Sequence, residues 1–328
     1  MTASATDRLP PVERVLQRDP RALGRALSAL ESRDPGRGEL LRAVGGGRAR
    51  RVGITGPPGA GKSTLVDRLI GSLRETGLEV AVLAVDPTSP YSGGAILGDR
   101  VRMHRHYTDP GVYIRSMATR GAMGGLAGAT RDAVALLDGA GFDWVLVETV
   151  GVGQDEVDVI GAVDTVAVVT LPGLGDDIQA IKAGVLEVAD LFVINKSDLE
   201  GAERTRRDLE TMLDMGPRDQ RRPEIVMTVA HRGEGIDEVL AALARHHDWL
   251  RESGTFTLRR REQLRVRVEA LVVEEIAAMM RRDESAQGEL DEAVEAGEDP
   301  YAAARRITAA LLHGRKTADG GAASDQKR

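Results

Sequence analysis

The sequence predicts an α/β protein built on a doubly wound, mostly parallel sheet. Between residues 51 and 250, seven short apolar segments alternate with longer amphipathic ones, and most of the seven are apolar on both faces. Strands with two apolar faces are typical of parallel sheets that are covered by helices on each side. The expected strands span residues 51–55, 80–85, 112–116, 143–149, 163–171, 190–195 and 224–229.

Helices are expected on either side of this 51–250 domain. Residues 1–50 form an N-terminal extension, in which Val15, Leu23, Leu27 and Leu30 follow helical spacing and predict one or two short helices. In a C-terminal arm, residues 251–313, apolar residues form one helical stripe, and two more helices are expected near 285–296 and 300–313. The stripe lies at positions 264, 268, 271, 272, 276 and 279. It favours a dimerisation arm, and the alternative is a helical cap on its own core. The tail, 314–328, is expected to be disordered.

The composition is typical of a soluble globular protein. The 328 residues are 42% apolar and 29% charged, and there is no cysteine, which excludes disulfides and thiolate metal sites and favours the cytoplasm. The net charge of −7 gives no reason to expect nucleic-acid binding. No apolar run approaches the ~20 residues that a membrane-spanning helix needs. The histidines in HRH at 104–106 and HH at 246–247 are expected to be solvated.

A phosphate-binding loop is predicted between the first strand and the helix after it. The segment GITGPPGAGKST matches the pattern G-x-x-x-x-G-K-[ST]. Its backbone N–H groups and the helix N-terminus bind phosphates, Lys62 reaches the β- and γ-phosphates, and the Ser63 hydroxyl ligates Mg²⁺. The alternative, a glycine turn with an incidental Lys-Ser pair, is disfavoured by both flanks. The predicted nucleotide-binding residues are Gly56, Pro57, Pro58, Gly59, Ala60, Gly61, Lys62, Ser63 and Thr64.

The pattern N-K-x-D at the end of the sixth expected strand predicts a guanine-recognition loop. A carboxylate at Asp198 accepts hydrogen bonds from N1–H and the N2 amino group of guanine, and adenine lacks this amino group. The Lys196 stem covers the base, and Asn195 braces the loop. Alone, the pattern fits a solvated loop better, but open α/β sheets bind ligands at strand carboxyl ends, so GTP is the expected nucleotide. Val229, Ala230 and His231 are expected to present backbone N–H groups to guanine O6. For His231, a position in a surface loop without ligand contact is an equal alternative.

Three acidic residues are candidate magnesium ligands together with Ser63. Asp86 and Glu148 end apolar strands, and Asp99 lies in the segment GGAILGDRVRM. Mg²⁺ prefers oxygen ligands and retains several waters, so these carboxylates act directly or through water. The alternatives are an Asx-Pro turn at Asp86 and a helix N-cap at Asp99. Gly151 is expected to bring its N–H to the γ-phosphate.

Taken together, these segments resemble the MeaB/ArgK family of P-loop GTPases, which is similar to the nickel-insertion (SIMIBI-like) GTPases. The matching strings are GITGPPGAGKST, VAVLAVDPTSPYSGGAILGDRVRM, DWVLVETVGVGQ, VTLPGLGDDIQAIKAG and NKSD, within a resemblance over roughly residues 15–310. The resemblance implies a homodimeric, metallochaperone-type protein that uses GTP to assemble, protect or reactivate an adenosylcobalamin-dependent acyl-CoA mutase, typically methylmalonyl-CoA mutase.

The resemblance also implies an extra switch loop at residues 171–184. Its active positions are Asp176, Gln179 and Lys182, acting beside Lys62 and Glu148 in hydrolysis of GTP to GDP and phosphate. Composition alone favours a solvated loop there. Because Val152 stands where a Ras-like enzyme carries its water-orienting Gln, intrinsic hydrolysis is expected to be slow and to rise when a partner orders the loop.

Two alternatives remain at the level of the sequence. One is a binding adaptor that uses GTP only to set its shape, for this or another cobalamin mutase. The other is a P-loop kinase linked to amino-acid transport, which the guanine-recognition pattern argues against. The lack of cysteines and of a polyhistidine tract disfavours a nickel role.

Overall fold

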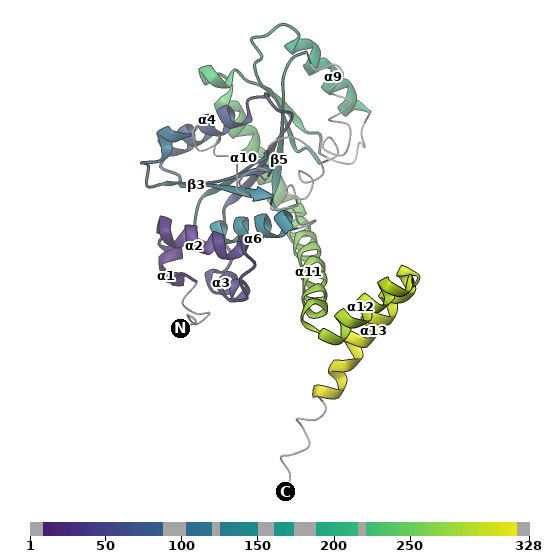
Figure 1. Cartoon of the computed structure of the whole chain (residues 1–328). Helices are drawn as coiled ribbons and strands as arrows, with labels where there is room; N and C mark the ends of the chain where they lie inside the picture. Colours follow the sequence, from purple (N-terminus) through teal and green to yellow (C-terminus); the bar gives the residue numbers. More distant parts are fainter. Residues whose placement is uncertain are drawn as a thin grey trace. The chain divides into compact units, whose positions relative to one another are not determined.

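The computed structural model describes residues 9–87, 103–119, 125–149, 161–173, 188–215 and 221–319. Seven strands form one sheet with the order β3-β2-β4-β1-β5-β6-β7, and every neighbouring pair is parallel. This confirms the predicted doubly wound sheet. Figure 1 labels two of these strands, β3 and β5. The strands are β1 (Arg50–Thr55), β2 (Val80–Pro87), β3 (Val112–Thr119), β4 (Trp144–Thr149), β5 (Thr165–Thr170), β6 (Leu191–Ile194) and β7 (Glu224–Met227).

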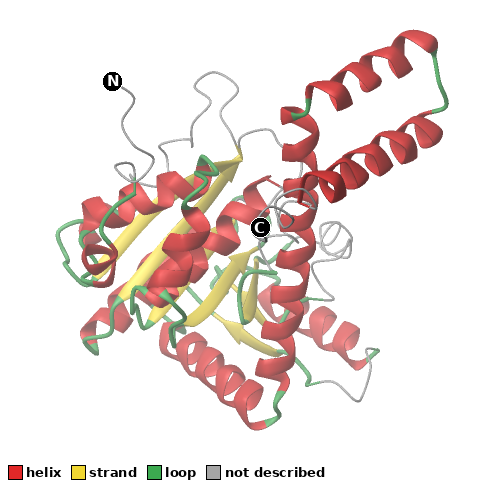
Figure 2. Cartoon of the chain, turned by 90° about the horizontal axis from the view of Figure 1, so that it is seen from below, coloured by secondary structure: helices red, strands yellow, loops and turns green. Residues whose placement is uncertain are grey.

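Helices cover both faces of the sheet (Figure 2). One apolar core lies between a sheet face and the helices α2 (Pro20–Glu31), α3 (Arg37–Val44) and α6 (Gly125–Gly139). The other core lies against α4 (Lys62–Glu75) and α10 (Ile236–Glu252). Alternate residues of one strand enter opposite cores, as Leu83 and Val82 of β2 do. The apolar character of both strand faces follows from this double cover.

The N-terminal extension contains three helices among the described residues, α1 (Val12–Leu16), α2 and α3. Helix α2 begins at Pro20 after Asp19, whose side chain accepts a hydrogen bond from the Ala22 N–H at 2.8 Å. Its apolar face is fully covered against the sheet, with Leu23 and Leu27 at 0% exposure. The sequence patterns predicted one or two helices here, where α1 and α2 lie, but not α3, which buries Leu40 and Val44.

The chain divides into two compact units, one up to Gln263 and one from Leu264 onward. Helix α11 (Thr255–Arg282) contributes residues to both. In the second unit, α12 (Glu284–Ala296) and α13 (Pro300–Asp319) form a small core of Ala286, Ile307 and Leu311. Helix α13 continues past residue 313, where the expected helix ends. Within the described residues, none of the helices combines the length and the apolar character that crossing a membrane requires.

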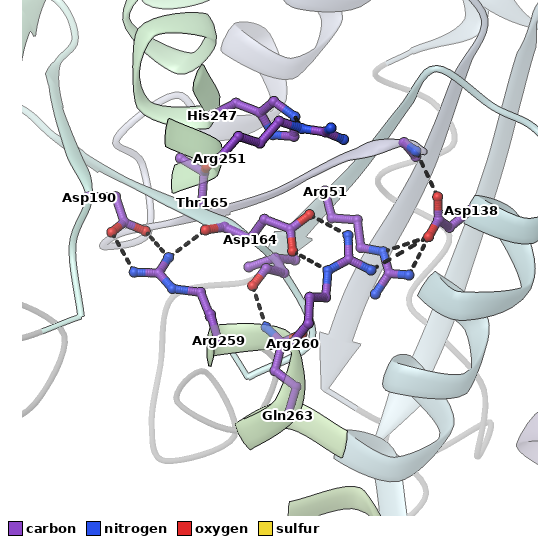
Figure 3. Close-up of polar contacts among 12 residues, drawn as sticks. Arg51, Asp138, Asp164, Thr165, Asp190, His247, Arg251, Arg259, Arg260 and Gln263 are labelled. Carbon is purple, nitrogen blue, oxygen red and sulfur yellow. Dashed lines mark hydrogen bonds and ion pairs between the residues drawn. The ribbon is translucent and has the colours of Figure 1, made fainter. Parts of the chain in front are cut away.

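The first turns of α11 are joined to the amino-terminal edge of the sheet by buried ion pairs (Figure 3). Arg260 Nε and Nη2 donate to the two oxygens of Asp164, each at 2.6 Å, directly before β5. Arg259 donates to both oxygens of Asp190, at 2.9 and 3.0 Å, directly before β6. Gln263 Nε2 donates to the Val163 carbonyl at 2.6 Å. The start of this helix is therefore fixed to the loops that enter two strands.

The same edge of the sheet buries histidines that the sequence suggested were solvated. His246 and His247 of α10 are 2% and 6% exposed. His246 lies between Thr165 Oγ1, at 2.8 Å from Nδ1, and Asp190 Oδ1, at 3.2 Å from Nε2. The prediction for this HH pair is wrong because α10 places both rings on its inner side, where neighbouring polar groups meet the ring nitrogens.

Candidate functional site

The phosphate loop connects β1 to α4 at the carboxyl edge of the sheet, as predicted. Gly56 has φ +140°, and a Cβ there would lie 1.9 Å from the Val169 carbonyl oxygen, so no other residue fits. Gly61 has φ +90° and precedes the helix that begins at Lys62. Lys62 is buried, and its Nζ donates to the carbonyls of Gly56 and Pro57 at 2.7 and 3.0 Å. The ammonium group is therefore held inside the loop at the positive end of the helix.

Ser63 and Glu148, two of the predicted magnesium ligands, lie together. Ser63 Oγ donates to Glu148 Oε1 at 2.5 Å, and the two side chains are 8% and 5% exposed. Glu148 is in β4, beside β1, and Thr149 Oγ1 donates to Thr55 Oγ1 at 2.9 Å to join the ends of the same strands. A hydroxyl and a carboxylate oxygen, buried next to a phosphate loop, are the kind of donors that Mg²⁺ prefers.

Asn195 joins the phosphate loop to the loops that end β6 and β7. It is 2% exposed. Its Nδ2 donates to the Ala60 carbonyl at 2.8 Å, and its Oδ1 accepts from the Ala230 N–H at 3.0 Å and from Thr228 Oγ1 at 3.1 Å. The side-chain amide of Asn195 therefore donates to the phosphate loop on one side and accepts from the segment after β7 on the other. This is the bracing that the N-K-x-D pattern suggested.

Asp198, the predicted guanine acceptor, stands at the surface of the same region. Its carboxylate pairs with Arg232, Oδ2 to Nη2, at 3.3 Å, and the two side chains are 26% and 54% exposed. Lys196 has φ +55°, a conformation that non-glycine residues rarely adopt. The loop is held in register by the Ser197 N–H, which donates to the Thr228 carbonyl at 3.0 Å.

The segment after β7 forms the short helix η3 (Ala230–Arg232), and its backbone N–H groups differ in availability. Val229 N donates to the Glu234 carbonyl, Ala230 N to Asn195 Oδ1, and Arg232 N to the Val229 carbonyl, at 2.9–3.0 Å. Among the described residues, no acceptor faces the His231 N–H. Of the three amides proposed to meet guanine O6, the His231 amide is thus the one that donates to no acceptor in the described part of the chain.

Several predicted site residues lie outside what the structure describes. These are Asp99, Gly151, Asp176, Gln179 and Lys182, and the side chain of Asp86. The backbone of Asp86 belongs to β2, one residue before that strand ends. The roles assigned to these residues stay predictions.

Polar contacts of α4 add residues that the sequence patterns did not single out. Asp67, one turn after Ser63, accepts from Arg105 Nε at 2.8 Å, and its carbonyl lies 3.1 Å from His106 Nε2. His106 is 8% exposed, so the prediction that the histidines of the HRH segment are solvated is wrong for this residue. Arg68 donates to two carbonyls of η3, at Ala230 and His231. The partners are separated by more than thirty residues, and no local pattern reveals such contacts.

The fold and the site together define a P-loop nucleotide-binding protein. A glycine loop with a buried lysine precedes a helix, and a serine–carboxylate pair lies beside it. Asn195 ties the loop with the N-K-x-D pattern to the glycine loop. All of these features gather at the carboxyl ends of parallel strands, where open α/β sheets bind ligands.

The comparisons with known proteins identify the family. The family model described as methylmalonyl Co-A mutase-associated GTPase MeaB matches residues 23–285, and the chain belongs to this family. A putative GTPase of Pyrococcus abyssi is 47% identical over 92% of this chain and 96% of its own length. The mouse protein named methylmalonic aciduria type A homolog, mitochondrial, is 39% identical over 73% of this chain and 59% of its own length.

A solved structure agrees with these relatives. The crystal structure of a LAO/AO transport system kinase superposes with a TM-score of 0.66 at 29% identity, and the match covers 95% of this chain and 99% of that one. The chain is accordingly a GTPase of the MeaB family, and it binds guanine nucleotides. This bears out the resemblance and the GTPase prediction drawn from the sequence.

Proposed function

We propose that this GTPase acts as a GTP-dependent chaperone of an adenosylcobalamin-dependent acyl-CoA mutase, with methylmalonyl-CoA mutase as the first candidate. The observation that carries the proposal is the convergence of the phosphate loop, the Ser63–Glu148 pair and the Asn195 brace, in a chain that matches the MeaB family model over residues 23–285. The name of the mouse relative points to methylmalonate metabolism in that protein.

Ser63 and Glu148 fit a magnesium ion as two oxygen donors next to the phosphate loop. When bound, the ion neutralises charge on the β- and γ-phosphates. The Ser63 hydroxyl is proposed as the direct ligand. Glu148 Oε1, which accepts a hydrogen bond from Ser63 Oγ at 2.5 Å, orients that hydroxyl. Asp86 and Asp99 are proposed as further carboxylates of the same site.

Lys62 and the loop amides supply positive charge for the transferred phosphoryl group. The Lys62 ammonium is already held between the Gly56 and Pro57 carbonyls, so little reorganisation is needed when phosphate oxygens take their place. With Val152 after Gly151, no glutamine orients water at that position. Intrinsic hydrolysis is therefore proposed to be slow, and Lys182, in the 171–184 loop with Asp176 and Gln179, to add charge when the mutase orders that loop.

Single-turnover hydrolysis by the wild type and by Lys182→Ala, each with and without mutase, tests this step. We expect equal basal rates and a lower partner-stimulated rate for the variant. An unchanged stimulated rate in Lys182→Ala removes Lys182 from the mechanism.

The partner is tested by affinity capture from native extract with the chain loaded with GTP or GDP. We expect a cobalamin-dependent mutase to be recovered, in an amount that depends on the nucleotide. Purified methylmalonyl-CoA mutase should then bind directly, whereas isobutyryl-CoA and ethylmalonyl-CoA mutases serve as competing candidates. Direct binding of none of the three contradicts the proposed partner.

The second proposed partner is another copy of this chain, at the C-terminal arm. The stripe of α11 is exposed, with Leu264 at 64%, Val268 at 49% and Val272 at 52%, and residues four apart lie on one side of a helix. Val272→Glu is expected to shift the mass in light scattering from dimer to monomer. The matched control is Val273→Glu, which changes a more exposed neighbour, at 67%. Val273 lies about 100° further round the helix and outside the stripe. A monomeric wild type at micromolar concentration contradicts the proposal.

A GTP-dependent adaptor is the second candidate function. It keeps the same nucleotide site but has no need of turnover, and the exposed arm supports a role in binding. Multiple-turnover hydrolysis that stays negligible with every mutase would favour the adaptor. Turnover that rises with one mutase favours the chaperone cycle.

A further inference from the structure

We propose that Arg68 is a positioning residue for guanine recognition, because it aims the His231 N–H at the base. Arg68 lies on α4, between one and two turns after the phosphate-loop residues Lys62 and Ser63. Its Nε donates to the Ala230 carbonyl at 3.1 Å, and its Nη2 donates to the His231 carbonyl at 2.6 Å. The two partners lie 162 and 163 residues away in the sequence, on the segment that follows β7.

The geometry of one peptide group carries the inference. The Ala230 carbonyl and the His231 N–H belong to the same peptide, and no described peptide of the chain is cis. In a trans peptide these two groups point in opposite directions. When Arg68 holds the carbonyl on the α4 side, the N–H is turned away from α4. The direction of the His231 amide is thus set by Arg68 and by the Gly233 N–H, which donates to the same carbonyl at 3.1 Å.

The amide that Arg68 aims is the one, among Val229 to Arg232, that makes no hydrogen bond within the described ranges. The Val229, Ala230 and Arg232 amides already donate to acceptors within the protein, whereas none of the described residues offers an acceptor to the His231 N–H. Asn195, which the N-K-x-D pattern places at the base, accepts a hydrogen bond from the preceding amide, the Ala230 N–H. An N–H group directed into this region suits a base oxygen such as O6 of guanine, and adenine carries an amino donor at that position.

The charge of Arg68 adds to the effect of its position. A guanidinium that donates to a carbonyl draws electron density toward the oxygen and makes the N–H of the same peptide a stronger donor. Asn195 fixes the opposite side of the segment through the Ala230 N–H. The base loop is therefore held from α4 and from β6 together. Because α4 begins at the phosphate loop, the distance between the phosphate and base subsites is set by a rigid helix.

The inference rests on the proposed assignment of the base loop, and the experiment separates the two. GDP affinity is measured for the wild type, Arg68→Ala and Arg68→Lys, together with two analogues. 6-Thio-GDP replaces O6 by a weak acceptor but keeps the donors facing Asp198, and IDP keeps O6 but lacks the N2 amino group. Arg74→Ala is the matched control, because Arg74 lies on the same helix and also donates to a carbonyl, that of Leu78, at 2.7 Å.

We expect Arg68→Ala to weaken GDP binding on the order of tenfold, as the loss of hydrogen bonds from a charged donor would. The penalty for 6-thio-GDP relative to GDP should shrink in this variant, while the penalty for IDP stays as in the wild type. Arg68→Lys, which keeps the charge and one donor, should restore part of the loss. Arg74→Ala should leave both analogue penalties at wild-type values.

An undiminished 6-thio-GDP penalty in Arg68→Ala overturns the inference, because a merely structural role lowers affinity for all three nucleotides alike. The proposed base loop fails separately if Asp198→Ala leaves the preference for GDP over IDP intact. Thermal melting of each variant shows whether it is folded. If Arg68→Ala does not fold, the comparison of Arg68→Lys with the wild type decides, and equal 6-thio-GDP penalties in both then count against the inference.

Discussion

Arg260 and Asp164 form a bidentate ion pair in which both nitrogen–oxygen distances are 2.6 Å, and it joins the start of α11 to the start of β5. The Asp164 side chain is 1% exposed and that of Arg260 is 24% exposed. Arg51, on β1, pairs with Asp138, and Arg260 Nη1 also lies 3.6 Å from Asp138 Oδ2. The pairs share partners, so the loss of one group leaves others without charge compensation.

Removal of Arg260 should therefore destabilise the protein clearly. Arg260→Ala leaves the Asp164 carboxylate buried without its main partner, and breaking such a pair costs about 3 kcal/mol of unfolding free energy. Chemical denaturation of the nucleotide-free protein measures this. Arg261→Ala, at the next and exposed position, is the control and should change stability by less than about 0.5 kcal/mol. Equal stabilities of the two variants would contradict the anchoring role of Arg260.

The neighbouring Asp190 makes the unfolding free energy of the protein depend on pH. Burial raises the pKa of Asp190, but hydrogen bonds from His246 and Arg259 lower it by more, so the folded-state pKa lies below the ordinary value of 3.8. The stabilisation that ionised Asp190 provides is complete well above pH 3.8 and is lost as the pH falls through the folded-state pKa.

Asp190→Asn tests this assignment. The difference in unfolding free energy between the wild type and the variant should be constant from about pH 5 to 7, where Asp190 is ionised in both states, and should shrink below about pH 4. Urea denaturation at each pH measures it. Glu224, whose pKa is lowered by Arg245 at the surface, is the comparison, and Glu224→Gln should give a smaller and salt-sensitive difference. A difference that is independent of pH down to pH 3 would remove Asp190 as its source.

The Ser63–Glu148 pair predicts how magnesium dependence responds to charge. Glu148→Gln keeps the size of the side chain but removes its negative charge, and the amide can present an N–H to Ser63 instead of an acceptor. The magnesium concentration for half-maximal hydrolysis should rise about tenfold or more, because the site loses a negative charge and the acceptor that orients the Ser63 hydroxyl. Magnesium titration of single-turnover GTP hydrolysis measures this.

Glu148→Asp separates reach from charge at the same position. It shortens the side chain by one methylene and keeps the carboxylate, so the magnesium requirement should lie between those of the wild type and Glu148→Gln. GDP binding without magnesium should differ little among the three proteins. If Glu148→Gln hydrolyses GTP with the wild-type magnesium requirement, Glu148 is not part of the metal site.

The local sequence patterns predicted the features that depend only on residues close together in the chain. The seven strands follow from continuous apolar runs, and the phosphate loop follows from a contiguous motif whose glycines must take φ +140° and +90°. The position of Glu148 beside Ser63 does not follow from these patterns. It requires β4 to pair with β1, which the sequence order leaves open and the structure supplies.

Those local patterns could not predict contacts between segments that are distant in the sequence. The bonds of Arg68 to η3 and of Arg260 to Asp164 join charged residues that look like solvated surface in the sequence. His246 is a partial exception. Val239, Leu243, His246 and Leu250 follow helical spacing and are all at most 2% exposed, so the spacing could have placed His246 on the inner face.

Asn195 gives the last prediction, because its side-chain amide forms hydrogen bonds with three groups, in the phosphate loop and in the segment after β7. Asn195→Ala would leave the Ala60 carbonyl, the Ala230 N–H and the Thr228 hydroxyl without their partner in a buried place. Each unsatisfied buried group costs about 1–3 kcal/mol, so we expect a loss of roughly 3 kcal/mol or more in unfolding free energy.

Asn195→Asp distinguishes the two sides of the brace. It keeps an oxygen for the Ala230 N–H and the Thr228 hydroxyl, but it places an oxygen opposite the Ala60 carbonyl, where the structure has a donor at 2.8 Å. The phosphate loop should therefore loosen while the base loop stays in position. GDP affinity should fall, while the ratio of GDP to IDP affinity should stay near the wild-type value. Thr228→Val is the control on the opposite side, because it removes one bond to Oδ1 and leaves the Ala60 contact intact. If Asn195→Asp binds GDP as the wild type does, Asn195 does not hold the phosphate loop, and the tie between the two subsites must come from α4 alone.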